Sequence, residues 1–356
     1  MSAERALLLL DDGTVFEGRP FGARGQAVGE AVFYTGVVGY QEVLTAPSYR
    51  ATVLALTYPI IGSYGANAED NESAQAHARA VVVKEYSAFY SNFRATGPLE
   101  PFLAERGIVG ICQVDTRALA VHLREHGEMK GLVASDGADE AALRQALAEG
   151  PEPFAADLVA ELGPAQAPPT QGPARHKLAV LDLGAARSLL DQLAALQAAL
   201  TIVPADAGAE AVLASDPQGV VLAGGPGDPR VPDYAATTAA GLLGKVPLLG
   251  IGLGHQVLAL ALGCGIERLR PGHHGLNYAV RHLGEGTSRI TVQHHSFVVD
   301  GESLPEGVEV THENVNDGSV EGLRSREHPA WGVQFHPAPD EMGRPSPELV
   351  QFVERL

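Results

Sequence analysis

The stretch PLLGIGLGHQVLALALG, residues 247–263, decides the fold of this chain. Residues 246–251 carry no polar side chain, which is typical of a strand buried on both faces of a sheet. Residues 255–262 have a helical pattern, so only the glycine-rich run 252–254 separates strand from helix. Ligands bind at the carboxyl ends of strands in open α/β sheets, and we therefore expect this turn to border a site.

The rest of the C-terminal half repeats this alternation of apolar strands and helices. Residues 178–183 are mostly apolar and precede a helical stretch from about 188 to 200, and 219–223 form another apolar strand. After residue 268 the pattern becomes rich in short strands. Together these features predict an α/β domain with a mostly parallel sheet flanked by helices.

The N-terminal half mixes strands, helices and many turns. Two short apolar runs on either side of the turn 11–13 predict a hairpin. The segment 163–177, GPAQAPPTQGPARHK, carries four prolines and reads as an exposed linker. We predict an N-terminal mixed α/β domain over 1–150, a helix end and proline-rich linker over 151–176, and a second domain over 177–356.

The composition excludes several classes of protein. Of the 356 residues, 45% are hydrophobic and 19% charged, so the chain can bury ordinary globular cores. The formal net charge of −18 repels phosphate groups, so we expect neither nucleic acid nor a membrane as the main partner. The first residues hold too short an apolar run for a signal peptide, and two cysteines fit a reducing compartment. We therefore expect a cytoplasmic protein.

The turn at 252–254 has the pattern of a nucleophile elbow, in which a sharp strand-to-helix turn exposes its central side chain. The helix N-terminus adds N–H groups and positive potential at such a turn. An ordinary tight turn of a doubly wound fold has the same pattern, and the residues leave both interpretations open. Gly252, at the tip, has no side chain and cannot attack a substrate.

Two other segments supply candidates for the same site. The loop GGPGDP, residues 224–229, follows a strand, and its glycines can bring backbone N–H donors close to an oxyanion. His336 follows another strand and is either a general base or a surface histidine. Asp340 and Glu341 are acids close to it in sequence, but the residue two positions after it is Ala338.

The remaining histidines and the cysteines predict no further site. The adjacent histidines at 273–274 and 294–295 would point to opposite faces of a strand, so we expect no metal ion. Cys264 lies beyond the elbow helix and is interpreted as a buried small residue. Cys112 lies in the other predicted domain, so neither thiol replaces a nucleophile at the turn.

These segments resemble the small subunit of carbamoyl phosphate synthetase, whose C-terminal half is a class I glutamine amidotransferase domain. The resemblance spans nearly the full chain and is carried by GYQEVLTAPSY (39–49), TYPIIGSYG (57–65), SNFR (91–94), VDTR (114–117), GGPGDP (224–229), GIGLGHQ (250–256) and GHHGLN (272–277). The combination of the first two segments separates this subunit from the amidotransferases of GMP and anthranilate synthesis.

The resemblance implies a reaction and a partner. In the family, the elbow cysteine attacks the amide of glutamine, a histidine acts as base, and a glutamate two residues later orients it. The ammonia passes through a tunnel to a large subunit, which uses ATP and bicarbonate to make carbamoyl phosphate for pyrimidine and arginine synthesis. The resemblance therefore implies a heterodimer, with ATP and magnesium on the large subunit and no cofactor on this chain.

The chain departs from the family where the chemistry takes place. The cysteine position falls on Gly252 and the glutamate position on Ala338, whereas the histidine is kept as His336. The resemblance assigns eight residues to the glutamine pocket: Ser48, Gly225, Gly227, Leu253, Gln256, His294, Ser296 and Phe297. Among these, His294 and Ser296 replace an asparagine and a glycine of the family.

A glutamyl thioester needs a thiolate, so we expect the chain's glutaminase activity to be lost. The urea-cycle synthetase, whose amidotransferase domain also lacks the cysteine, is a precedent within the family. The alternatives are glutamine hydrolysis by another mechanism, changes introduced on purpose or by sequence error, and a non-catalytic module that binds glutamine. Four differences in one pocket favour relaxed selection over independent errors.

Overall fold

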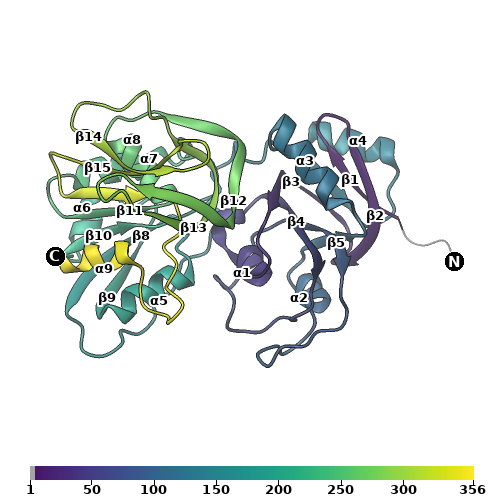
Figure 1. The fold of residues 1–356 in the computed structure, drawn as a ribbon, viewed down its shortest axis with the longest axis horizontal. Helices are drawn as coiled ribbons and strands as arrows, with labels where there is room; N and C mark the ends of the chain where they lie inside the picture. Colours follow the sequence, from purple (N-terminus) through teal and green to yellow (C-terminus); the bar gives the residue numbers. More distant parts are fainter. Residues whose placement is uncertain (1–4) are drawn as a thin grey trace. The chain divides into compact units, whose positions relative to one another are not determined.

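The computed structural model describes residues 5–356, which form two compact units. Unit 1 comprises the chain up to Ala156 together with Arg270–Gly275, and unit 2 comprises Asp157–Leu269 and Leu276–Leu356 (Figure 1). None of the helices in residues 5–356 has the length and apolar character that crossing a membrane requires.

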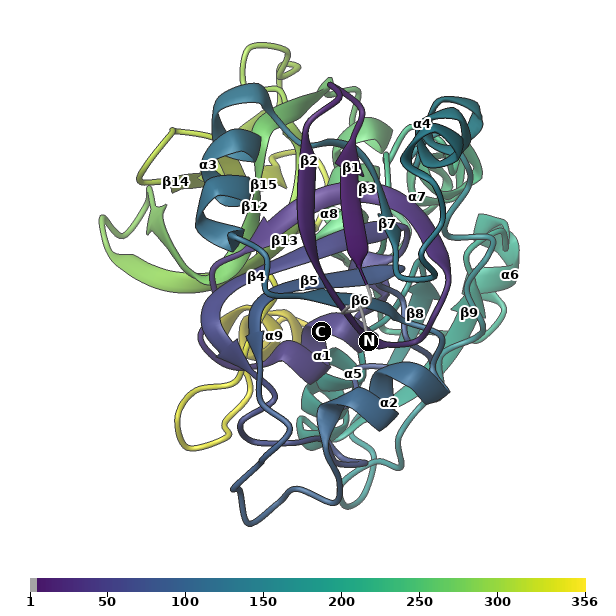
Figure 2. The same cartoon turned by 90° about the vertical axis from the view of Figure 1, so that its right-hand side faces the viewer.

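Seven strands of unit 1 close into a barrel in the order β1-β2-β6-β5-β4-β3-β7 (Figure 2). The strands are β1 (Ala6–Leu10), β2 (Val15–Gly22), β3 (Gln26–Tyr34), β4 (Thr52–Ile61), β5 (Ala80–Tyr86), β6 (Val109–Cys112) and β7 (Met129–Ala134). The helices are α1 (Tyr40–Thr45), the 3-10 helix η1 (Pro47–Tyr49), α2 (Leu99–Glu105), α3 (Thr116–His126) and α4 (Glu140–Glu149). The predicted hairpin is confirmed, because β1 and β2 pair antiparallel.

The strand β1 is apolar throughout because both of its faces are covered. Leu8 and Leu10 belong to the cluster that includes Leu119 of α3, whereas Leu7 belongs to the cluster that includes Leu143 of α4. Successive side chains of a strand point to opposite faces, so two clusters form on either side of one strand. The run of four leucines at residues 7–10 is therefore a doubly buried strand.

Unit 2 is built on a nine-stranded sheet in the order β13-β12-β14-β15-β16-β11-β10-β8-β9. The strands are β8 (His176–Asp182), β9 (Ala198–Pro204), β10 (Gly219–Leu222), β11 (Leu248–Ile251), β12 (Ile266–His282), β13 (Ser288–Val299), β14 (Val308–Asn314), β15 (Val320–Ser325) and β16 (Ala330–Val333). The helices are α5 (Arg187–Ala195), α6 (Ala209–Leu213), α7 (Asp233–Leu242), α8 (Leu253–Ala261) and α9 (Pro347–Glu354).

The sheet of unit 2 has a parallel half and an antiparallel half. The strands from β9 through β8, β10 and β11 to β16 pair parallel, and the predicted α/β domain with flanking helices is confirmed. The pairings β16–β15, β15–β14 and β14–β12 are antiparallel, and they come from the strand-rich sequence after residue 268. Helices α7 and α8 share one core cluster and α5 and α9 share another, each cluster containing alternate residues of β8.

The proline-rich segment expected as a linker is part of unit 2, which begins at Asp157. Leu158 and Val159 are buried, at 3% and 4% exposed. Further along, the backbone N–H of Ala165 donates to the Asp182 carboxylate at 2.7 Å. The segment 163–175 is largely exposed, as predicted, but hydrogen bonds attach it to the second unit.

Replacing Gly254 by alanine should destabilise unit 2, because the new Cβ would lie 2.0 Å from the carbonyl oxygen of Leu222, a backbone atom. We expect the free energy of unfolding, measured in urea, to fall by about 3 kcal/mol, as in strongly overpacked cores. Gly224→Ala is the matched control, because its Cβ would meet only the Ile251 carbonyl oxygen at 3.8 Å. Equal stability of the two variants would contradict the close approach of α8 to β10.

Candidate active site

Four parallel strands of unit 2 end at one edge of the sheet, and the candidate residues follow these ends. The strands are neighbours in the order β8, β10, β11 and β16. They lead, respectively, into the loop before α5, the glycine-rich loop 224–227, the turn at Gly252 and the segment that carries His336. Parallel strands bring their carboxyl ends to the same edge, so these segments lie together.

The turn at Gly252 has the backbone of an elbow. Gly252 has φ 55° and ψ −114°, a combination that residues with a side chain rarely adopt, and α8 begins at the next residue. Its N–H donates to the carbonyl oxygen of Val333 at 2.9 Å, which fixes the turn to β16. A Cβ here would meet only Gly224 Cα at 3.7 Å and the Gln334 carbonyl oxygen at 3.8 Å. The turn thus has the backbone shape of an elbow and space for a side chain that Gly252 does not supply.

The glycine-rich loop after β10 packs against the end of β8. A Cβ at Gly225 would lie 2.1 Å from the carbonyl oxygen of Leu183, so this position accepts only glycine. Gly227 has φ 85° and borders Leu158. Because Gly224, Gly225 and Gly227 have no side chains, no side chain of theirs would block the approach of a ligand to the backbone N–H groups of the loop.

His336 lies partly exposed after β16 and contacts a hydroxyl group. Its backbone N–H donates to the carbonyl oxygen of Val292 at 2.8 Å, which ties the segment to β13. Its Nε2 lies 3.0 Å from the hydroxyl oxygen of Ser188, in the first turn of α5. The His294 ring is also near, with 6.2 Å between the two ring centroids. His336 therefore has a serine partner that the sequence did not predict.

The loop that follows His336 is held by Gln192 of α5. The Gln192 side chain donates to the carbonyl oxygen of Pro337 at 2.7 Å and accepts from the backbone N–H of Ser346 at 2.9 Å. Ala338 is exposed within this loop and brings no carboxylate to the histidine.

The two acids close to His336 in sequence are both exposed. Asp340 accepts hydrogen bonds from the backbone N–H of Arg344 at 2.9 Å and from its side chain at 2.6 Å. These hydrogen bonds hold the pKa of the Asp340 carboxyl below its usual value. Asp340 thus forms an ion pair with Arg344 across its own turn of the loop.

The other predicted pocket residues are mostly buried. Leu253 and Phe297 are each 4% exposed and Ser296 is 5% exposed. The Gln256 amide nitrogen donates to the Phe297 carbonyl oxygen at 2.6 Å and to the Gln334 side chain at 3.0 Å. Gly225, Gly227 and His294 remain partly exposed. Ser48 is partly exposed in η1 of unit 1.

A buried polar network connects β13, β14 and β15, and the sequence did not predict it. Glu321 is fully buried, and its Oε1 accepts hydrogen bonds from Gln293 at 2.7 Å and Asn314 at 3.1 Å. The ring of His295 lies 3.2 Å from the Gln293 side-chain oxygen. Glu321 is the one acid of β15, next to Val320, and it was the available signal, because a buried carboxylate needs donors around it.

The histidine after the elbow is structural. His255 is fully buried in α8, and burial lowers its pKa to about 3, so it is neutral near pH 7. Its Nδ1 would lie 2.9 Å from a Cβ placed on Gly332 of β16. The positive potential at the start of α8 therefore comes from the helix itself and not from this imidazole.

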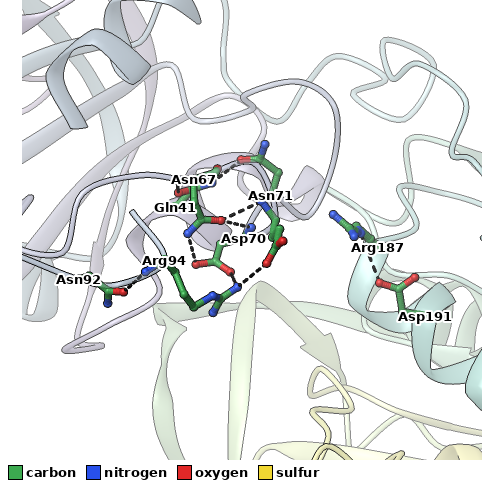
Figure 3. A network of polar contacts seen from close by, with 9 residues as sticks. Gln41, Asn67, Asp70, Asn71, Asn92, Arg94, Arg187 and Asp191 are labelled. Atoms are coloured by element: carbon green, nitrogen blue, oxygen red, sulfur yellow. Dashed lines mark hydrogen bonds and ion pairs between the residues drawn. The ribbon is translucent and has the colours of Figure 1, made fainter. Parts of the chain in front are cut away.

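Unit 1 holds a polar cluster in which Gln41 and Arg94, from two of the motifs that carry the family resemblance, contact residues 67–71 (Figure 3). The Gln41 side chain donates to Asn71 at 2.8 Å and accepts from the backbone N–H of Asn67 at 3.0 Å. Asp70 joins the cluster by accepting from Asn67 at 2.7 Å and pairing with Arg94. The cluster thereby attaches residues 67–71, which follow β4, to the helix α1.

Two families match this sequence, one in each half. The family described as carbamoyl-phosphate synthase small chain, CPSase domain, matches residues 8–133. The family described as glutamine amidotransferase class-I matches residues 179–343. A solved glutamine amidotransferase from Thermotoga maritima is similar over 45% of this chain and 75% of its own, with 19% identity and a TM-score of 0.37.

Curated relatives match the chain over nearly its whole length. The carbamoyl phosphate synthase small chain of Syntrophotalea carbinolica is 42% identical, covering 94% of this chain and 92% of its own. The small chain of Akkermansia muciniphila is 41% identical, covering 99% of this chain and 96% of its own. This chain therefore belongs to the carbamoyl phosphate synthase small chain family, with a class I glutamine amidotransferase domain in its C-terminal half.

Proposed function

We propose that this chain is the small subunit of a carbamoyl phosphate synthase that runs on ammonia, and that its own glutaminase activity is lost. The observation that carries the proposal is Gly252, because the elbow offers no atom that can attack an amide. Cys264, the cysteine nearest to it in sequence, is 4% exposed, and burial raises the pKa of its thiol to about 11. A thiol in that state is a poor source of the thiolate that the family's reaction needs.

The chemistry of synthesis would then take place on a large subunit. The relatives are small chains by name, which supports a partner of that kind. In this proposal ATP and magnesium bind the large subunit, and this chain carries no cofactor. Its contribution is assembly of the complex, while the amidotransferase fold remains without its reaction.

An exposed apolar patch on unit 1 supports a protein partner. The patch consists of Val37, Val38, Tyr58, Ile60, Phe89, Tyr90 and Phe93. Its segments are neighbours, since Ser91 donates a backbone hydrogen bond to Ser63 and Gly39 donates one to the Tyr64 hydroxyl. Phe89 is 89% exposed and Phe93 is 97% exposed, and large exposed apolar groups on neighbouring segments are typical of interaction sites.

The complex of this chain with the large subunit should make carbamoyl phosphate from ammonium and not from glutamine. Loss of a triad nucleophile costs on the order of a million-fold in other hydrolases, so glutamine should support less than about a thousandth of the ammonium rate. The measurement is carbamoyl phosphate formation with each nitrogen donor, using glutamine freed of ammonia. Comparable rates with the two donors would contradict the loss of glutaminase activity.

Restoring the two triad positions should not be sufficient to restore hydrolysis. We expect Gly252→Cys with Ala338→Glu to fold, at a strain cost of about 1–3 kcal/mol at the elbow, yet to release glutamate slowly because His294 and Ser296 remain in the pocket. Adding His294→Asn and Ser296→Gly should raise glutamate release by about 100-fold, the scale of a misplaced substrate.

The control for the restored variants is Gly252→Ala with the same other changes. It imposes the same backbone strain without supplying a thiol, so it should release no glutamate. Full activity in the first double variant would show that His294 and Ser296 leave the pocket intact.

Replacing Phe89 and Phe93 by serine should weaken binding of the large subunit. Both side chains are almost fully exposed, so unit 1 should keep its stability while the patch loses two apolar anchors. We expect the dissociation constant, measured by calorimetry, to rise at least about tenfold. Met342→Ser is the matched control, because Met342 is 81% exposed but lies in unit 2. An unchanged dissociation constant in the Phe89 and Phe93 variant would remove the patch from the interface.

A further inference from the structure

The contact between Ser188 and His336 has the geometry of a nucleophile with its base. The hydroxyl oxygen of Ser188 and Nε2 of His336 lie 3.0 Å apart, although 148 positions separate the two residues. Ser188 comes from the helix after β8, and His336 comes from the segment after β16. Both side chains are partly exposed, so a small molecule can reach them.

We propose that Ser188 and His336 form a serine–histidine pair that hydrolyses esters of small carboxylic acids through an acyl-serine intermediate. This activity goes beyond the proposed subunit function and needs neither glutamine nor a large subunit. It uses His336, the triad member that the resemblance finds in this chain. The hydroxyl of Ser188, on α5, takes the place of the thiol that the elbow lacks.

The reaction balances without any other reactant. His336 Nε2 takes the proton from the Ser188 hydroxyl while the oxygen bonds to the acyl carbon, and the bond to the alkoxide breaks. The protonated imidazole gives that proton to the departing alcohol. Water then attacks the acyl-serine with His336 again as base, which releases the acid and restores Ser188. The sum is one ester and one water converted to an acid and an alcohol.

The surroundings favour Ser188 over the other hydroxyl near the site. Ser296 is only 5% exposed, whereas Ser188 lies partly exposed at the start of a nine-residue helix. The amide groups and dipole at a helix start favour negative charge on a tetrahedral intermediate. A Cβ on Gly252 would meet only Gly224 Cα at 3.7 Å and the Gln334 carbonyl oxygen at 3.8 Å, so the turn beside the segment that carries His336 is not crowded.

The structure also indicates why the substrate is an ester and not an amide. Ala338 supplies no carboxylate to stabilise the imidazolium that forms during attack. Removing that acid from a serine triad costs about 10⁴-fold, so the pair needs a leaving group better than an amine. A phenolate meets this need best, because it departs with little help from an acid, whereas an alkoxide departs as the imidazolium protonates it.

The test uses the full chain with p-nitrophenyl acetate and with a fluorophosphonate probe that bonds to activated serines. We expect peptide mapping by mass spectrometry to place the probe on Ser188 of the unaltered chain. His336→Ala should slow labelling and ester hydrolysis by about 100-fold, since a general base contributes about 10²–10⁴, and Ser188→Ala should abolish labelling. Ser215→Ala is the matched control, because that partly exposed hydroxyl donates to the Val212 carbonyl oxygen.

Three results would overturn the proposal. The first is absence of labelling on the unaltered chain, and the second is a probe bonded elsewhere. The third is hydrolysis that survives Ser188→Ala but not His336→Ala, because a lone imidazole would then be the nucleophile. The labelled position in the unaltered chain decides the matter even if a variant fails to fold.

Discussion

The close approach of α8 to β10 at Gly254 is the constraint on which the rest of unit 2 depends. No side chain fits between this position and the Leu222 carbonyl oxygen. The helix must therefore begin directly after β11, and the chain reverses within the single residue Gly252. The glycine-rich loop and His336 then take their places at the ends of the neighbouring parallel strands. The packing of α8 on β10 thus determines the backbone geometry at the carboxyl ends of the parallel strands.

The sequence predicted the parts of the structure that local pattern controls. The strand and helix expected over 246–262 are β11 and α8, because an apolar run followed by glycine and a helical pattern fits few other local structures. The contact between Ser188 and His336 could not be predicted, because it depends on the order of β8, β10, β11 and β16, which one sequence does not specify. The barrel of unit 1 was missed for the same reason, although its first hairpin was predicted.

Some residues at the strand ends are required by the packing of the fold, and others are not. Gly225 and Gly254 are required by packing, since a Cβ at either position would collide with backbone atoms. Gly252 and Ala338 have no such role. A residue with a side chain at the φ of Gly252 carries strain of about 1–3 kcal/mol. Glycine at that position avoids this strain, so the residue that leaves the elbow without a side chain also favours the folded state.

Asp182, at the end of β8, connects two segments through its two carboxylate oxygens. One oxygen accepts from the Ala165 N–H at 2.7 Å, and the other accepts from Gly184 at 3.1 Å and Ala185 at 2.9 Å. A gene fragment that starts at the amidotransferase match, residue 179, would lack the segment 163–175, whose Ala165 N–H binds this carboxylate. Chimeras with other small chains are therefore best joined before Asp157, so that the segment 163–175 and the strand β8 come from the same parent.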